Sequence, residues 1–92
     1  MRKVKMVASG RVQGVGFRWS VQFLAMEIGD IYGRVWNNED GTVTILAQSD
    51  DSEKLSKFIH EIRKVPSCMA KVTYLDVTMA NFEDFTDFRM AN

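Results

Sequence analysis

The chain has 92 residues, 46% of them apolar, which is enough for one packed core and too few for two. Twelve basic side chains balance twelve acidic ones, and this neutral charge disfavours binding to nucleic acids or anionic membranes. The single cysteine, Cys68, excludes an internal disulfide, and no Cys and His cluster has zinc-ligand spacing. We therefore predict one domain over residues 1–92, cytoplasmic, without a signal peptide or membrane segment.

The N-terminal segment predicts a strand, a loop and a helix. Apolar residues alternate over 4–8 and are followed by glycines at positions 10, 14 and 16, which is typical of a strand leading into a glycine-rich loop. From Phe17 the apolar spacing changes to three and four, which predicts a helix ending at Ile28 with Gly29 as its stop. One face of this helix would carry Phe17, Val21, Leu24, Ala25 and Ile28.

A hairpin and a second helix are predicted next. Tyr32–Asn37 and Thr42–Gln48 are rich in β-branched and aromatic residues. The Asp-Gly pair at 40–41 favours a turn between them, so the two strands should be antiparallel neighbours. The polar cluster at 49–52 offers N-caps for a second helix, which should end before Pro66. Its apolar stripe would be Leu55, Phe58, Ile59 and Ile62.

The last part of the chain predicts two more strands. Lys71–Met79 alternates with a shift of phase, and after a polar segment at 81–86 the residues Phe88 and Met90 suit a brief terminal strand. The element order is then β, α, β, β, α, β with a short last strand. This split βαβ order predicts an α+β fold in which two helices cover one face of an antiparallel sheet.

The segment Gly10–Arg18, with the sequence GRVQGVGFR, places the glycine-rich loop directly before a helix N-terminus. Backbone N–H groups and the helix dipole favour an anion there, and glycines at 14 and 16 let it approach closely. Arg18 adds a guanidinium that can bind phosphate oxygens bidentately. The spacing matches neither a Walker loop nor a dinucleotide fingerprint, so these residues alone leave a phosphate site and a plain turn both open.

The other reactive residue types have ordinary structural interpretations. His60 lies off the apolar stripe of the second helix, so we expect a solvated surface histidine, and Cys68 has no neighbouring base to activate it. The acidic pairs lack the spacing of a calcium loop, so caps and solvated loops are expected. RNA-recognition domains share the βαββαβ order, but the neutral charge and the missing RNP1 pattern favour core packing of Trp36 and Tyr74 over base stacking.

Two segments together resemble the motifs of the acylphosphatase family. Gly10–Arg18 is similar to its first motif, and Gly33-x-Val-x-Asn37 followed by Gly41-x-Val43 is similar to its second. Without this resemblance, the asparagines of the second segment would be interpreted as turn formers. The similarity extends over the whole chain. It implies a ferredoxin-like βαββαβ sandwich and an enzyme that hydrolyses acyl phosphates to a carboxylate and inorganic phosphate by direct attack of water, with no cofactor or metal.

The resemblance also implies a role for each site residue. Arg18 and the backbone amides of the loop would hold the phosphoryl group, and the Asn37 amide would position the attacking water. The phosphate-binding loop comprises Gln13, Gly14, Val15, Gly16, Phe17 and Arg18.

Several positions depart from the family pattern. They are Ala8, Arg34, Trp36, Ser49 and one extra residue between Gly29 and Gly33. We expect Arg34 and Trp36 to reshape the rim of the site. Two alternatives remain at this point: a phosphate or carbamoyl phosphate receptor that does not turn over, and a regulatory domain of the same fold. We also expect a monomer, because no exposed apolar stripe should remain once both helices are packed.

Overall fold

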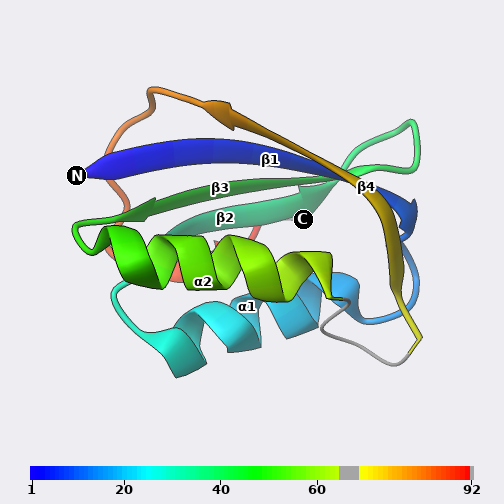
Figure 1. Cartoon of the computed structure of the whole chain (residues 1–92). Coiled ribbons are helices and arrows are strands. Elements are labelled where there is room, and N and C mark those ends of the chain that lie inside the picture. The colour runs from blue at the N-terminus through cyan, green and yellow to red at the C-terminus, as the bar shows by residue number, and fades with distance from the viewer. Residues whose placement is uncertain (65–68, 92) are drawn as a thin grey trace.

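The computed structural model describes residues 1–64 and 69–91, so Pro66 and Cys68 lie outside the described residues. The elements of the described part are, in chain order, β1 (Arg2–Arg11), α1 (Phe17–Ile28), β2 (Tyr32–Asn37), β3 (Val43–Ser49), α2 (Ser52–Arg63), β4 (Lys71–Met79) and β5 (Phe88–Met90) (Figure 1). Every predicted element is present, and the first strand is longer than the alternation at 4–8 indicated.

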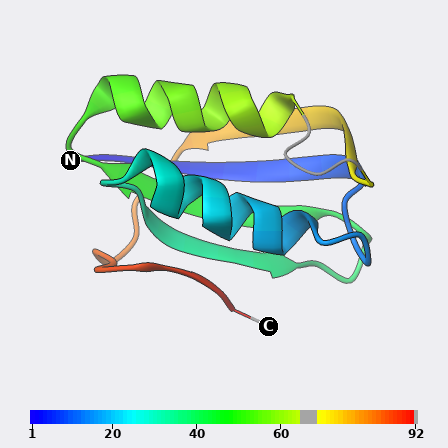
Figure 2. The same ribbon diagram turned by 90° about the horizontal axis from the view of Figure 1, so that it is seen from below.

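The strands form one sheet with the order β4-β1-β3-β2-β5, and both helices lie on the same face of it (Figures 1 and 2). The predicted ferredoxin-like sandwich is therefore confirmed, but the sheet is mixed, because β5 pairs in parallel with β2. The reason lies in the path of the chain. β4 ends beside Val4, at the end of the sheet where β2 begins, so a strand that starts there runs in the same direction as β2.

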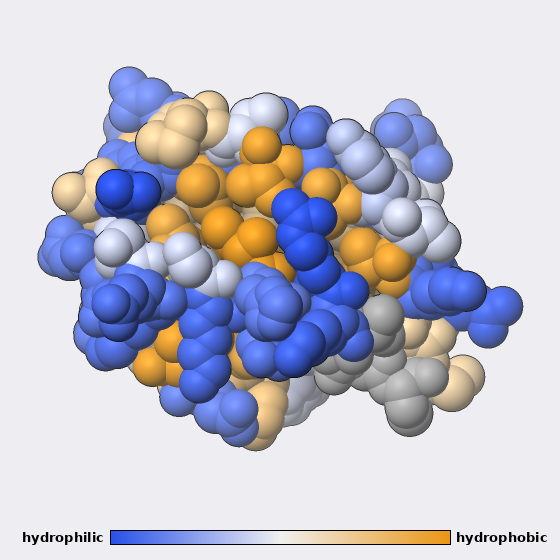
Figure 3. Space-filling view, in the orientation of Figure 1, coloured by the Kyte–Doolittle hydropathy of each residue, from blue (hydrophilic) through white to orange (hydrophobic). Residues whose placement is uncertain are grey.

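The core lies between the helices and the sheet. The buried apolar side chains of the sheet are Val4, Met6, Ala8, Val35, Val43, Ile45, Ala47, Leu75 and Phe88. The helices add Phe17, Val21, Ala25, Leu55, Phe58 and Ile62, which are the centres of the two predicted stripes. Hydrophilic side chains cover the outward side of α2 (Figure 3), and His60 is exposed as expected. Tyr74 is 64% exposed, so its predicted core packing is wrong; β4 is an edge strand and little packs over it.

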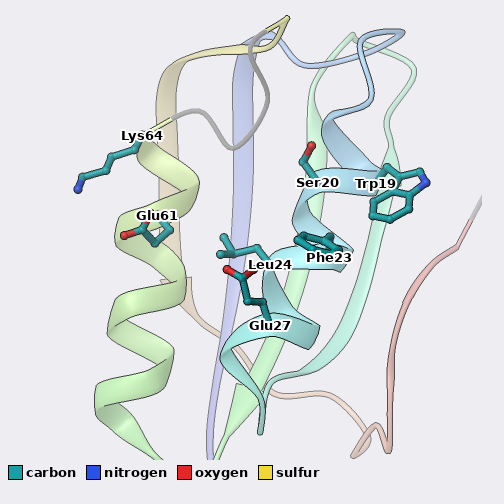
Figure 4. Close-up of a pocket in the computed structure, with 7 residues that line it drawn as sticks. All are labelled: Trp19, Ser20, Phe23, Leu24, Glu27, Glu61 and Lys64. Atoms are coloured by element: carbon teal, nitrogen blue, oxygen red, sulfur yellow. The ribbon is translucent and has the colours of Figure 1, made fainter.

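A second apolar stripe stays exposed on α1. Trp19, Phe23 and Met26 are 60%, 51% and 68% exposed, and Trp19 and Phe23 also border a groove of about 440 Å³ between the helices (Figure 4). The expectation that no exposed apolar stripe would remain is therefore wrong, and so is the argument for a monomer built on it. The physical reason is that α1 is apolar on two sides, only one of which faces the sheet. No helix in the described part of the chain is long and apolar enough to cross a membrane.

Candidate active site

The loop between β1 and α1 depends on two left-handed glycines. Gly14 has φ 72° and Gly16 has φ 79°. A Cβ built on either residue would meet nothing within 4 Å, so space does not limit these positions. The backbone conformation limits them instead, because L-amino acids adopt the left-handed conformation only at a cost of about 1–2 kcal/mol. Glycines 14 and 16 of the first motif are thus explained by the shape of the loop.

The N-terminus of α1 is built differently from that of α2. The first N–H groups of any helix have no carbonyl partner within that helix. In α2 the Asp51 carboxylate accepts from the N–H groups of Glu53 and Lys54, at 3.0 and 3.2 Å. In α1 the N-cap is Gly16, which has no side chain to accept from these N–H groups. A bound anion would supply the missing acceptor at a position that the helix dipole also favours.

Gln13 joins the loop to the hairpin that follows Asn37. Its Nε2 donates to the carbonyl oxygens of Asn38 and Thr42, at 2.7 and 3.0 Å. The N-terminus of α1 and the end of β2 consequently lie at the same end of the molecule (Figure 2). The side chain of Gln13 thus fixes the loop relative to the second motif, a role that the sequence alone did not indicate.

The two asparagines of the second motif have different places. Asn38 organises the turn, since its Nδ2 donates to the hydroxyls of Thr42 and Thr44 at 2.9 and 2.7 Å. Asp40 accepts from the Thr42 hydroxyl and backbone N–H, and these hydrogen bonds, the hydroxyl first, lower the pKa of its carboxyl group. Asn37 instead ends β2, opposite Val43, on the helix-facing side that it shares with Val35.

Asn37 is only partly exposed, and its Oδ1 atom is buried. Asn37 also interacts with other groups of the protein. On the neighbouring strand β5, Met90 pairs with Val35, and the next residue, Ala91, donates its N–H to the Val35 carbonyl at 2.9 Å. The end of β2 therefore lies between the hairpin on one side and the C-terminal strand on the other.

A cavity of about 260 Å³ opens at the loop. It brings the two glycines, Phe17 and Arg18 together with three residues that sequence reasoning did not assign to the site: Val12, Trp19 and Met90. Asn37 lies outside the lining of this cavity, on β2. Of the other predicted loop residues, Phe17 borders the cavity and is buried in the core, and Val15 packs against that core.

The departures from the family pattern lie mostly away from the site. Arg34 and Trp36 alternate with the buried Val35, so they point to the sheet face opposite the helices, and the expectation that they reshape the rim is wrong. Arg34 donates to the Asp87 carboxylate at 2.8 Å, which lowers the pKa of that carboxyl group, and it stacks on Phe85. Both contacts fix the segment that leads into β5.

The remaining departures are structural. Ser49 is buried, and its Oγ accepts from the Asp51 N–H at 3.0 Å, just before α2. Asp30 lies between Gly29 and Gly33, in the segment that has one extra residue, and its φ is 57°. Its carboxylate forms a salt bridge with the Lys54 ammonium group at 2.5 Å. Gly33 itself is required by packing, because a Cβ there would lie 1.7 Å from the Leu46 carbonyl oxygen.

The comparisons with known proteins agree with this geometry. The family model described as acylphosphatase matches residues 4–90. The chain belongs to the acylphosphatase family. It is 54% identical to the acylphosphatase of Lactococcus lactis subsp. lactis (strain IL1403), over 98% of each chain, and 47% identical to that of Lactobacillus johnsonii (strain CNCM I-12250 / La1 / NCC 533), over 96% of each.

A solved structure gives the same result for the fold. The acylphosphatase from Bacillus subtilis superposes with a TM-score of 0.91 at 34% identity, and each chain is covered completely. Acylphosphatases of nearly the same length thus match this chain from end to end. These matches support an acylphosphatase enzyme, a hydrolase, over the phosphate or carbamoyl phosphate receptor.

Proposed function

We propose that the chain hydrolyses the carboxyl–phosphate bond of acyl phosphates, with Arg18 and the amides of the loop binding the phosphoryl group and Asn37 orienting the attacking water. The observation that carries this proposal is the uncapped start of α1 at Gly16, with Arg18 lining the same cavity. The amides and the guanidinium can together neutralise much of the charge of a phosphoryl group.

The chemistry requires few groups. An acyl phosphate departs as a carboxylate, which is a weakly basic leaving group, so no strong general acid is needed. What remains is to position the water and to stabilise the phosphoryl charge. An amide cannot act as a general base at neutral pH, but the Asn37 amide group can form a hydrogen bond with water and fix its approach. In this proposal the water's proton passes to a phosphate oxygen.

The proposal needs neither a metal nor a cofactor, since Arg18 supplies the positive charge. The first test is hydrolysis of benzoyl phosphate by the purified protein in excess EDTA, compared with the spontaneous rate. We expect turnover well above the spontaneous rate and equal with and without EDTA. Turnover that EDTA abolishes and Mg²⁺ restores would contradict the metal-free mechanism. A folded protein that binds phosphate without turnover would favour the receptor alternative. The cytoplasmic location stays a prediction.

Gln13→Ala should lower kcat/KM by about 10- to 100-fold, because the loop would no longer be fixed relative to Asn37 and small displacements of reacting groups are costly. Gln13→Glu, which keeps the shape but has no N–H to donate, should behave similarly. The measurement is steady-state hydrolysis of benzoyl phosphate together with urea unfolding. Thr73→Ala is the control, because it removes a side-chain hydrogen bond to the Ser9 carbonyl on β1. If both variants lost equal stability and neither lost activity, Gln13 would have no positioning role.

A further inference from the structure

The lining of the cavity at the loop is of two chemical kinds. The glycines of the loop and Arg18 form its polar part, where the proposed function places the phosphoryl group. Its apolar part includes two large exposed side chains, Trp19 and Met90, which are 60% and 39% exposed, besides the buried Val12 and Phe17. Inorganic phosphate would use only the polar part. The apolar part suits an apolar group attached to that phosphate.

The tertiary structure brings Trp19 and Met90 to the same cavity. Trp19 follows Arg18 in the first turn of α1, and in Figure 4 it points away from α2, on the side where the C-terminal strand runs. Met90 is the last residue of β5, and its N–H donates to the Gln22 side chain of α1 at 3.1 Å. This hydrogen bond and the pairing with Val35 hold β5 against both α1 and β2.

A ring contact supports the Trp19 side of this apolar surface. The Trp19 ring contacts that of Phe23 one turn along α1, with centroids 5.6 Å apart and planes inclined at 42°. A surface that is already ordered binds a ligand with little further loss of side-chain entropy. Exposed apolar area also favours an apolar group that covers it, because that area then leaves water.

We propose that Trp19 and Met90 bind the acyl group, so that this enzyme prefers acyl phosphates with an aromatic or other apolar acyl group to those whose acyl group ends in a methyl. The inference rests on the proposed function, since the phosphoryl group has to bind at Arg18 for the acyl group to reach Trp19. The volume of about 260 Å³ is smaller than that of sites for drug-sized ligands. It suits a phosphoryl group that carries a single ring or a short chain.

The test compares benzoyl phosphate with acetyl phosphate, using the full chain. In Trp19→Ala we expect kcat/KM for benzoyl phosphate to fall about five- to tenfold, mainly through KM, as expected for the loss of an aromatic contact. For acetyl phosphate the fall should be no more than about twofold, because a methyl group covers little of the indole. Trp19→Phe should retain most of the preference. Met90→Ala should shift the preference in the same direction.

Met26→Ala is the matched control for Met90→Ala. Met26 is also an exposed methionine, but it lies two turns along α1 and does not line the cavity. Met26→Ala should leave kcat/KM unchanged for both substrates. Equal losses for the two substrates in Trp19→Ala, or an unchanged benzoyl-to-acetyl ratio, would overturn the inference while leaving the proposed function intact. If the wild-type protein hydrolysed neither substrate, the proposed function itself would fail.

Discussion

Arg18→Ala should lower kcat/KM for acyl phosphates by at least about a thousandfold and remove measurable inhibition by inorganic phosphate. The guanidinium is the charged group of the loop cavity, and an arginine that stabilises a transferring phosphoryl group is worth about 10³–10⁵ in rate. Both the substrate and inorganic phosphate would lose their contact with the guanidinium, so phosphate affinity and turnover should fall together. Steady-state kinetics with benzoyl phosphate, and phosphate inhibition in the same assay, measure the two effects.

Two further variants, one at position 18 and one at position 11, separate the effect of charge from that of geometry. Arg18→Lys keeps the charge but cannot form the planar bidentate contact, so we expect an intermediate loss. Arg11→Ala removes an exposed arginine from the same motif, at the end of β1, and should change kcat/KM by less than about threefold because exposed charges act weakly at a distance. If Arg11→Ala and Arg18→Ala were equally damaging, the loss would reflect net charge, and the assignment of Arg18 would be wrong.

Asn37→Ala should lower kcat by about a hundredfold or more and leave the inhibition constant of inorganic phosphate nearly unchanged. The loss is the size expected when one positioned hydrogen-bonding group is removed from an active site. Phosphate affinity should survive, because in the proposed mechanism the Asn37 amide contacts the water and leaves the phosphoryl oxygens to Arg18. Arg18→Ala and Asn37→Ala are therefore distinguished by phosphate inhibition as well as by rate.

The adjacent Asn38 provides the control for Asn37. Asn38→Ala removes the hydrogen bonds to Thr42 and Thr44 that organise the turn, so it should lower the free energy of unfolding by about 1–3 kcal/mol. Its effect on kcat should be much smaller than that of Asn37→Ala. The result that contradicts the assignment is an Asn37→Ala protein that is destabilised as much as Asn38→Ala and loses no more activity.

Local patterns sufficed for much of the fold. The helix from Phe17 to Ile28, the hairpin around Asp40 and Gly41, and the cap before the second helix follow from spacing, turn chemistry and capping preferences, which act between near neighbours. The pairing of β5 was beyond such reasoning. Its direction depends on where β4 ends in space, and a three-residue strand carries too little pattern to indicate a partner.

Prediction of the site was limited in the same way. The glycine loop, Arg18 and Asn37 stand in two contiguous motifs, so the resemblance could assign them from sequence. The cavity wall at Trp19 and Met90 joins residues from opposite ends of the chain, which no local pattern connects. The outward direction of Arg34 and Trp36 follows from the alternation of β2, once Val35 is known to face the helices. The exposed side of α1 was missed because only one apolar face was considered.

The place of β1 in the sheet has a consequence for folding kinetics. β1 is a central strand, yet its partners β3 and β4 come much later in the chain, and Val4 pairs with both Ala47 and Met79. Such pairings have a high contact order, and domains dominated by them fold in milliseconds to seconds because long loops close before native contacts form. During synthesis, β1, the strand that leads into the glycine-rich loop, can therefore pair only after both neighbouring strands have been made. A ligand that binds only the assembled loop would then stabilise the protein chiefly by slowing its unfolding.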